Sequence, residues 1–193
     1  MARAGTHIVG LDIGTTKVCV LIAEPRGAGA IDIVGFGSAP SRGMRKGVVV
    51  NLDSCVASIK QAVEEAELMA GCSVDRAYVG VAGSHVRGLN SRGVVAISGR
   101  DHEVTRDDVH RVLAAARAVH IPPEREIVHV LPQEFMVDDQ DGIHDPAGMT
   151  GSKLQANVHI VTASVTAAQN LVNSVNRAGV EVEEVVLEQL AAA

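Results

Sequence analysis

The hydrophobic residues of this chain fall into short runs separated by polar and glycine-rich turns. The runs are rich in Val, Ile and Leu, which predicts strands that are mostly buried. The strands predicted in this way are residues 7–13, 17–23, 31–37, 77–82 and 180–187. The loop 25–29 separates the second strand from the third, so the first three strands form a meander.

Two segments between these strands have helical periodicity instead. Apolar residues recur at steps of three and four from Leu52 to Ala70, with Asn51 and Asp53 as candidate N-caps and Gly71 at the end. The same spacing over residues 166–178 predicts a second long helix, and residues 188–193 are expected to begin another. This alternation of strands and helices predicts an α/β fold with a mixed sheet.

The middle of the chain has a different order of elements. Short strands, including 94–98, are punctuated by glycines, and Thr105 with Asp108 resembles a capping box that opens a helix ended by Pro122-Pro123. Two long strands follow at 126–137 and 154–162, joined by the polar loop 138–152. We therefore expect a strand-helix-strand-strand α+β subdomain over residues 84–164, inserted between residues 1–83 and 165–193 of the α/β subdomain.

Composition narrows the class of protein. Hydrophobic residues make up 47% of the chain but aromatic residues only 2%, so the core must consist of Val, Ile, Leu and Ala. The net charge of −6, without a basic block, argues against a nucleic-acid partner. The three cysteines lack metal or redox spacing, and the first residues lack a signal peptide, which indicates a cytoplasmic location.

The segment Asp12–Lys17, with the sequence Asp-Ile-Gly-Thr-Thr-Lys, carries the candidate chemistry. Gly14 allows a tight turn and close approach to a ligand, while Thr15 and Thr16 supply hydroxyl donors beside backbone N–H groups. Lys17 adds a positive charge for phosphate, and Asp12 is placed to hold Mg²⁺ through water. The alternative, about as frequent for so short a motif, is an ordinary solvated β-turn.

The residues after Lys17 distinguish this motif from the common phosphate loops. P-loop and dinucleotide-binding motifs run from a strand through a loop into a helix, whose N-terminus receives the phosphates. Here residues 18–22 are β-like, so we expect a hairpin to hold the phosphates. Two lobes that each contribute such a hairpin are typical of actin, sugar kinases and heat-shock ATPases.

Longer stretches of the chain resemble the FtsA family of bacterial actin-like cell-division proteins. They cover nearly the whole length and are residues 9–15, 40–44 with 46–47, 66–70, 129–135 and 138–162. The resemblance implies an actin-like, ribonuclease-H-like fold in which the inserted subdomain replaces the usual small subdomain of actin. It also implies ATP as cofactor with Mg²⁺, with Gly14, Thr15, Thr16 and Lys17 contacting the β- and γ-phosphates and Asp12 near the metal.

The resemblance further implies a scaffold rather than an ordinary enzyme. Members of the family polymerise and link the tubulin-like division ring to the cytoplasmic face of the membrane at midcell, and they recruit later division proteins, here through residues 84–164. Their ATP hydrolysis is weak or doubtful. Glu188, which follows the last strand, corresponds to a residue that orients water in related ATPases, although a helix N-terminal Glu favoured by the helix dipole is the more frequent explanation.

The chain is shorter than the resemblance requires. No second phosphate hairpin, adenosine-binding loop or C-terminal membrane helix follows, so we expect a shortened protein that by itself binds ATP weakly or not at all. The resemblance implies that contacts with the membrane and with the division ring belong mainly to the parts that this chain lacks. The alternatives are a sugar-kinase-like phosphotransferase of the same fold or a non-functional remnant. A metal ion bound between His129 and His159 is a minor alternative, because no histidine or cysteine spacing matches a zinc site. The basic loop Ser41–Gly47 has two interpretations: it contacts nucleotide or a neighbouring subunit, or it is a plain turn.

Overall fold

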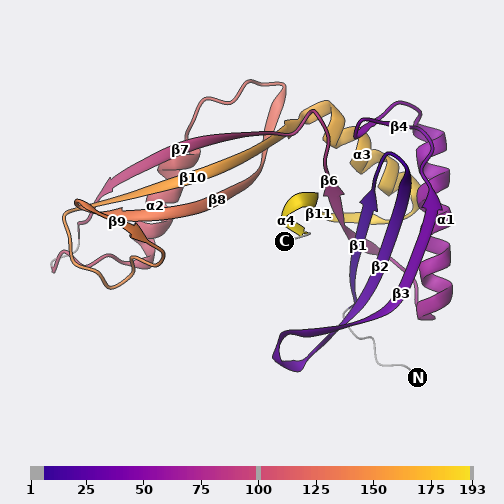
Figure 1. Ribbon diagram of the computed structural model, residues 1–193, viewed down its shortest axis with the longest axis horizontal. Helices are drawn as coiled ribbons and strands as arrows, with labels where there is room; N and C mark the ends of the chain where they lie inside the picture. The colour runs from indigo at the N-terminus through magenta and orange to yellow at the C-terminus, as the bar shows by residue number, and fades with distance from the viewer. Residues whose placement is uncertain (1–6, 99–100, 192–193) are drawn as a thin grey trace. The chain divides into compact units, whose positions relative to one another are not determined.

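The computed structural model describes residues 7–98 and 101–191 of the 193-residue chain. The chain divides into two compact units, unit 1 (Met1–Val86 and Ser164–Ala193) and unit 2 (Arg87–Ala163), which are labelled by element in Figure 1. Unit 2 therefore interrupts unit 1 in the sequence. Each unit has its own sheet and its own core.

A five-stranded mixed sheet forms the centre of unit 1, in the order β11-β6-β1-β2-β3. β1 (Ile8–Ile13) pairs antiparallel with β2 (Lys17–Arg26), which pairs antiparallel with β3 (Ala30–Pro40). On its other side β1 pairs parallel with β6 (Arg76–Val81), which pairs parallel with β11 (Glu181–Leu187). The carboxyl ends of three parallel strands thus meet at the edge where β1 turns into β2.

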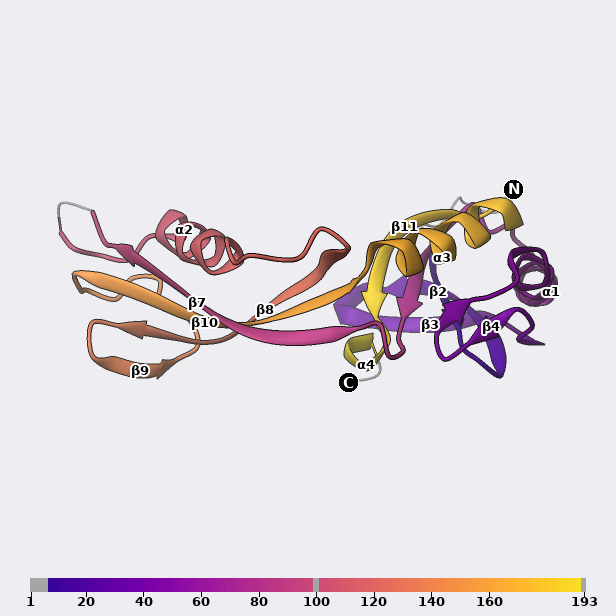
Figure 2. The ribbon, with the colours of Figure 1, turned by 90° about the horizontal axis from the view of Figure 1, so that it is seen from above.

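Two helices cover one face of this sheet. α1 (Leu52–Ala70) packs on β2 and β3 and also against α3 (Val165–Ala178), and the core residues of the sheet alternate toward this face. The buried positions of β1 and β2 are Val9, Leu11, Ile13, Val18, Val20, Ile22 and Ala23. The short helix α4 (Glu188–Ala191) lies on the other side of the sheet from α3, as Figure 2 shows.

The predicted caps of α1 are confirmed. The side chain of Asn51 accepts a hydrogen bond from the backbone N–H of Ser54 at 2.9 Å, and Gly71 ends the helix in the left-handed region at a φ of 69°. The candidate N-cap Asp53 lies in the first turn instead. An acidic side chain is favourable there because it faces the positive end of the helix dipole.

Unit 1 differs from expectation in two turns. The predicted loop at 25–29 is shorter, because β2 continues to Arg26 and only a 3₁₀ turn (η1, Gly27–Gly29) separates it from β3. The expected loop at 41–47 contains β4 (Met44–Arg45) and the turn of a small hairpin, whose second strand is β5 (Val48–Val49). Strands of two residues are too short to produce an alternating hydrophobic pattern, so the sequence could not predict them.

Unit 2 is a four-stranded sheet with one helix. The strand order is β7-β10-β8-β9, formed by β7 (Arg87–Ala96), β10 (Lys153–Ser164), β8 (Arg125–Val137) and β9 (Gln140–Ile143). α2 (Arg106–Arg117) packs on this sheet, and the buried residues between them include Val112, Ala116, Leu154, Val158 and Ile160.

The two strands that connect unit 2 to the rest of the chain are direct neighbours. Arg87 at the start of β7 lies opposite Thr162 near the end of β10. The Thr162 hydroxyl donates to the Arg87 carbonyl oxygen at 3.2 Å, and the Arg125 guanidinium donates to the Thr162 carbonyl oxygen at 2.9 Å. These contacts connect β7, β10 and β8 at the end of the sheet where the chain enters and leaves unit 2.

Three expectations for unit 2 were wrong in detail. The short strand predicted at 94–98 is the second half of the ten-residue strand β7, which passes through Gly93 without a break. A Cβ atom at Gly93 would lie 2.1 Å from the Val112 carbonyl oxygen of α2, so this glycine allows the helix to approach the sheet rather than ending a strand. In addition, α2 ends at Arg117, before Pro122-Pro123, and the polar loop contains β9.

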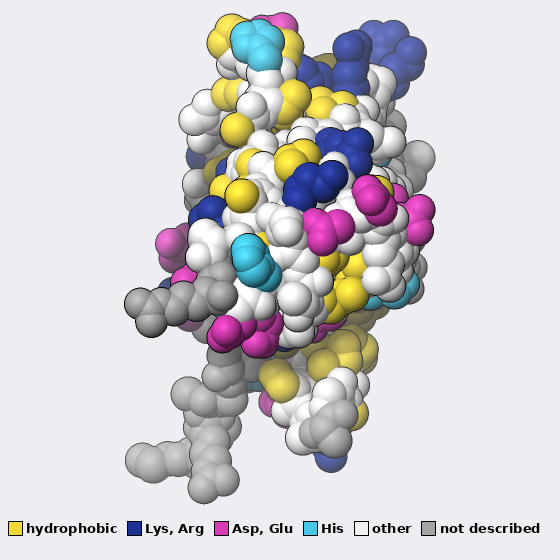
Figure 3. Space-filling model, turned by 90° about the vertical axis from the view of Figure 1, so that its left-hand side faces the viewer, with side chains coloured by type: hydrophobic (Ala, Val, Ile, Leu, Met, Phe, Trp, Pro, Cys, Tyr) yellow, Lys and Arg dark blue, Asp and Glu magenta, His cyan; other side chains and the backbone are white. Residues whose placement is uncertain are grey.

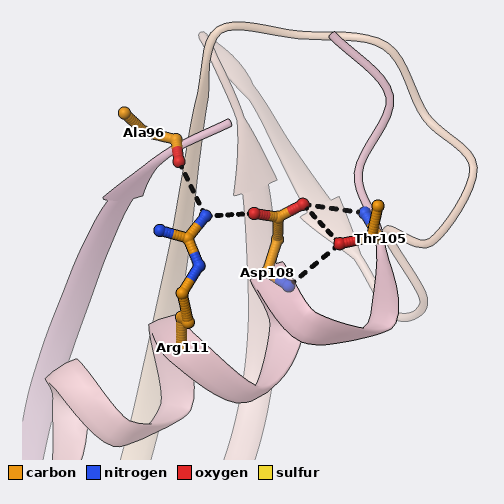
Figure 4. Close-up of polar contacts among 4 residues, drawn as sticks. All are labelled: Ala96, Thr105, Asp108 and Arg111. Atoms are coloured by element: carbon orange, nitrogen blue, oxygen red, sulfur yellow. Dashed lines mark hydrogen bonds and ion pairs between the residues drawn. The ribbon is translucent and has the colours of Figure 1, made fainter. Parts of the chain in front are cut away.

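The capping box predicted for α2 is confirmed, with Asp in the position that usually holds Glu (Figure 4). The Asp108 carboxylate accepts hydrogen bonds from the Thr105 backbone N–H at 2.9 Å and from its hydroxyl at 2.7 Å. Arg111, one turn later, donates to the same carboxylate and to the Ala96 carbonyl oxygen of β7. These bonds lower the pKa of Asp108 to about 2, although the residue is only 4% exposed.

On the face shown in Figure 3, acidic, basic and hydrophobic side chains are interspersed. None of the helices within residues 7–98 and 101–191 is long and apolar enough to cross a membrane.

Candidate functional site

The turn between β1 and β2 has the geometry that the sequence predicts. Residues 18–23 belong to β2 and not to a helix, and Asp12 at the end of β1 lies opposite Cys19. The Gly14 backbone N–H donates to the Lys17 carbonyl oxygen at 3.0 Å, which closes the turn. The remaining exposed N–H and hydroxyl groups of Thr15 and Thr16 are thereby presented at the tip of a hairpin.

This turn forms one wall of a cavity of about 530 Å³ in unit 1. All five residues predicted for the phosphate site line it, namely Asp12, Gly14, Thr15, Thr16 and Lys17. Glu188, the first residue of α4, lines the same cavity. The structure thus brings together residues that are separated by more than 170 positions in the sequence.

Two other segments complete the lining. Lys46 and Gly47 come from the turn between β4 and β5, and residues 82–84 come from the segment that follows β6. Sequence reasoning singled out the basic loop Ser41–Gly47 without deciding its role, and it did not identify Gly83 or Ser84. The only available signal for Ser84 was its position just after a predicted strand of the sheet, where binding residues gather in α/β folds.

The charges around the cavity are mixed. Lys17 and Lys46 face it with Asp12 and Glu188, together with the hydroxyl groups of threonine and serine residues. Burial raises the pKa of Asp12, and the nearby charge of Lys17 opposes this effect. Ionised Asp12 therefore carries a desolvation cost that a bound cation would reduce. The arrangement suits an anion that arrives together with a metal ion.

Within the described ranges, no group of three or more His, Cys, Asp and Glu side chains is placed to hold a metal ion. The Nδ1 atom of His159 lies 2.7 Å from the side-chain oxygen of Asn90, so this ring nitrogen is within hydrogen-bond distance of a residue of the neighbouring strand β7. A Mg²⁺ ion near Asp12 would need water and the ligand itself as further ligands.

A more apolar hollow of about 440 Å³ adjoins the site on the face of the sheet that α1 and α3 leave open. It shares Asp12, Lys17 and Glu188 with the polar cavity and is otherwise lined largely by apolar side chains, Leu21, Phe36 and Tyr78 among them. Polar groups at one end and apolar surface beside them are typical of sites for ligands that have both a charged and a flat apolar part.

The comparison with protein families gives a match over unit 2. Residues 83–162 match the family model described as the SHS2 domain inserted in FTSA. This range covers the four strands and the helix of unit 2 almost completely. The inserted position of unit 2 therefore corresponds to an insertion that defines the family model itself.

The similarity to curated relatives extends over nearly the whole chain. It is 51% identical to the cell division protein FtsA of Pseudomonas aeruginosa over 191 residues, which are 99% of this chain and 45% of that protein. It is 50% identical to FtsA of Borreliella burgdorferi and 41% identical to FtsA of Escherichia coli, each over 95% of this chain. The chain spans 45% and 43% of the length of these two relatives.

A solved structure supports the fold independently of close sequence similarity. The PilM–PilN type IV pilus biogenesis complex superposes on 95% of this chain with a TM-score of 0.62 at 16% identity, and the match covers 48% of that chain. The mixed sheet with its helices is an actin-like α/β fold that carries the SHS2 insertion. With this fold, the matched insertion and identities of 41 to 51% over nearly all of its residues, the chain belongs to the FtsA family of cell-division proteins.

Proposed function

We propose that this chain provides the phosphate-holding half of an ATP site in a division scaffold of the FtsA type. One observation carries the proposal: the β1–β2 turn, both lysines and Glu188 line a single cavity at the edge where parallel strands end. Ligands of α/β sheets bind at such edges, outside the carboxyl ends of the strands.

Each residue of the turn has a role that its chemistry suits. The backbone N–H groups and hydroxyls of Thr15 and Thr16 donate to the β- and γ-phosphates, Gly14 lets the turn approach these phosphates closely, and Lys17 neutralises part of their charge. Asp12 holds Mg²⁺ through water, which offsets the cost of keeping a half-buried carboxylate ionised. The metal, when bound, supplies charge neutralisation between the phosphates.

Glu188 is the candidate for orienting an attacking water. It lines the cavity, it is exposed, and it stands in the first turn of α4. That position also favours an acidic residue through the helix dipole alone. We propose weak hydrolysis at most for this chain.

The relatives are more than twice as long as the matched region, and we propose that the second half of the nucleotide site in this family lies outside that region. The affinity of the present chain for ATP is then low, because the base and part of the phosphate chain lack donors. At the level of the whole family protein, we propose filament formation, a link between the tubulin-like division ring and the cytoplasmic face of the membrane at midcell, and contacts of residues 84–164 with later division proteins.

A titration of the ¹⁵N-labelled chain with Mg·ATP, followed by NMR, tests the nucleotide site at low affinity. We expect the amide signals of Gly14 to Lys17 to shift in a saturable way, and Thr16→Val and Lys17→Ala to weaken the binding. Lys60→Ala is the matched control, because Lys60 is an exposed lysine of α1 that does not line the cavity. Shifts that spread over other surfaces, or equal effects of Lys17→Ala and Lys60→Ala, would contradict the proposed site.

The scaffold proposal has a separate test against the kinase alternative. The chain is incubated with Mg·[γ-³²P]ATP and a panel of sugars and polyols, and the products are separated by chromatography. We expect no labelled sugar phosphate. Transfer of label to any member of the panel would replace the scaffold with a phosphotransferase of the same fold.

A further inference from the structure

The turn between β4 and β5 has an unusual backbone for its residues. Arg45 pairs with Val48, so only Lys46 and Gly47 connect the two strands. Both have positive φ angles, 52° for Lys46 and 79° for Gly47. Two successive residues with positive φ define the type I′ turn, whose twist suits a tight hairpin.

Lysine is a poor choice for the first position of such a turn. Type I′ turns favour Asn-Gly or Asp-Gly, because Asn and Asp tolerate the left-handed region while most other side chains are strained in it. Turn formation alone therefore does not explain Lys46. A residue held in a strained conformation is more often found where its side chain has a task, such as contact with a ligand.

Close backbone contacts fix this turn against the segment that follows β6. A Cβ atom at Gly47 would lie 2.3 Å from the Ala82 carbonyl oxygen, and one at Gly83 would lie 2.7 Å from the Lys46 carbonyl oxygen. The Nε2 atom of His85 lies 3.2 Å from the Gly47 carbonyl oxygen, within hydrogen-bond distance. The position of the Lys46 backbone is thus set by two glycines and one histidine, while its side chain remains exposed at the cavity.

We infer that Lys46 is a second phosphate-binding cation of this site and that the ligand it serves is a nucleotide polyphosphate chain. The inference rests on the proposed ATP site. Without ligand, the charges of Lys17 and Lys46 balance those of Asp12 and Glu188, so the cavity suits a polyanion only when it brings its own cation. A single lysine on the β1–β2 turn leaves most of a triphosphate uncompensated, and Lys46 adds a positive charge from a separate, rigidly held element.

The substitution Lys46→Asn separates charge from turn geometry. Asn removes the positive charge and is well suited to the left-handed region, so the hairpin is retained. We expect Lys46→Asn to raise the dissociation constant for Mg·ATP about fivefold, the usual effect of one charged contact at an exposed site. We also expect its thermal midpoint to equal or exceed that of the unsubstituted chain, because the strain at this position is relieved.

Arg45→Gln is the matched control. Arg45 is the adjacent residue, is exposed, carries the same charge and does not line the cavity. If Lys46→Asn weakened the binding of Mg·ATP only by lowering the overall positive charge near the site, Arg45→Gln would weaken the binding equally. We expect Arg45→Gln to change the dissociation constant less than twofold.

The two proposals fail in different ways. If Lys17→Ala weakens binding of Mg·ATP but Lys46→Asn acts like Arg45→Gln, the role of Lys46 is wrong and the nucleotide site stands. If Lys46→Asn lowers the thermal midpoint together with binding, Lys46 supports the turn and is not a phosphate ligand. If the chain shows no saturable response to Mg·ATP, the nucleotide site and the role of Lys46 are both overturned.

Discussion

Replacement of Asp108 by Asn should destabilise unit 2 by an amount that depends strongly on pH. The folded structure lowers the pKa of this carboxyl to about 2 from 3.8, first through the Thr105 hydrogen bonds and then through Arg111. A shift of this size corresponds to about 2 kcal/mol of stability at neutral pH. The group is 4% exposed, so screening by water and salt reduces this value little.

The direction of the pH dependence follows from the lowered pKa. A carboxyl that binds its proton more weakly in the folded state contributes its stability above the unfolded pKa and loses it as the pH falls toward 2. The difference in unfolding free energy between Asp108→Asn and the unsubstituted chain should therefore be about 2 kcal/mol at pH 7 and about half of that at pH 3.

Urea denaturation followed by far-UV circular dichroism measures this difference. The chain has one tyrosine, Tyr78 in β6, and no tryptophan, so tyrosine fluorescence reports on unit 1. Asp107→Asn is the matched control, since Asp107 stands in the same helical turn, is exposed and lies outside the capping box. Equal losses for the two substitutions, or a loss for Asp108→Asn that is the same at pH 3 and pH 7, would refute the role given to the buried carboxylate.

Three further outcomes are expected. Gly93→Ala should destabilise unit 2 by about 2 kcal/mol or more in urea titrations, because its Cβ atom would meet the backbone of α2, and a loss below about 0.5 kcal/mol would contradict this packing. Asp12→Asn should raise the urea midpoint at pH 7, because the pKa of this half-buried carboxyl is raised and its ionisation opposes folding; the gain should vanish at pH 3, and a midpoint that falls at pH 7 would be inconsistent with it. Cys55 is fully buried, whereas Cys19 and Cys72 are partly exposed, so Ellman's reagent should label Cys19 and Cys72 in the native protein and Cys55 only after unfolding. Rapid labelling of all three thiols would show that α1 is less tightly packed than described.

The features that could be predicted from the sequence are those formed by residues that lie close together along the chain. The caps of α1 and the capping box of α2 could be predicted because each involves side chains within three or four residues of the backbone they bind. The turn between β1 and β2 could be predicted for a similar reason, since Asp12 to Lys17 are contiguous and the β-like residues after them exclude a helix.

Features that depend on distant residues could not be predicted. Gly93 was interpreted as a break between strands, and only the position of Val112 in α2 shows that it accommodates a helix. The role of the Lys46-Gly47 turn stayed undecided because its sequence lacks the Asn that marks a type I′ hairpin and because its neighbour Gly83 is more than 30 residues away.

The pairing of Arg87 with Thr162 has a consequence for how such a protein can evolve. The chain leaves unit 1 and returns to it through adjacent strands, which in an antiparallel pair are separated by only about 5 Å. A two-residue turn spans that gap, so residues 87–163 can be removed, exchanged or enlarged as a cassette without changing the connectivity of the host sheet. New binding surfaces can thus be acquired by replacing the cassette, while the edge of the unit 1 sheet that carries the β1–β2 turn is left unchanged.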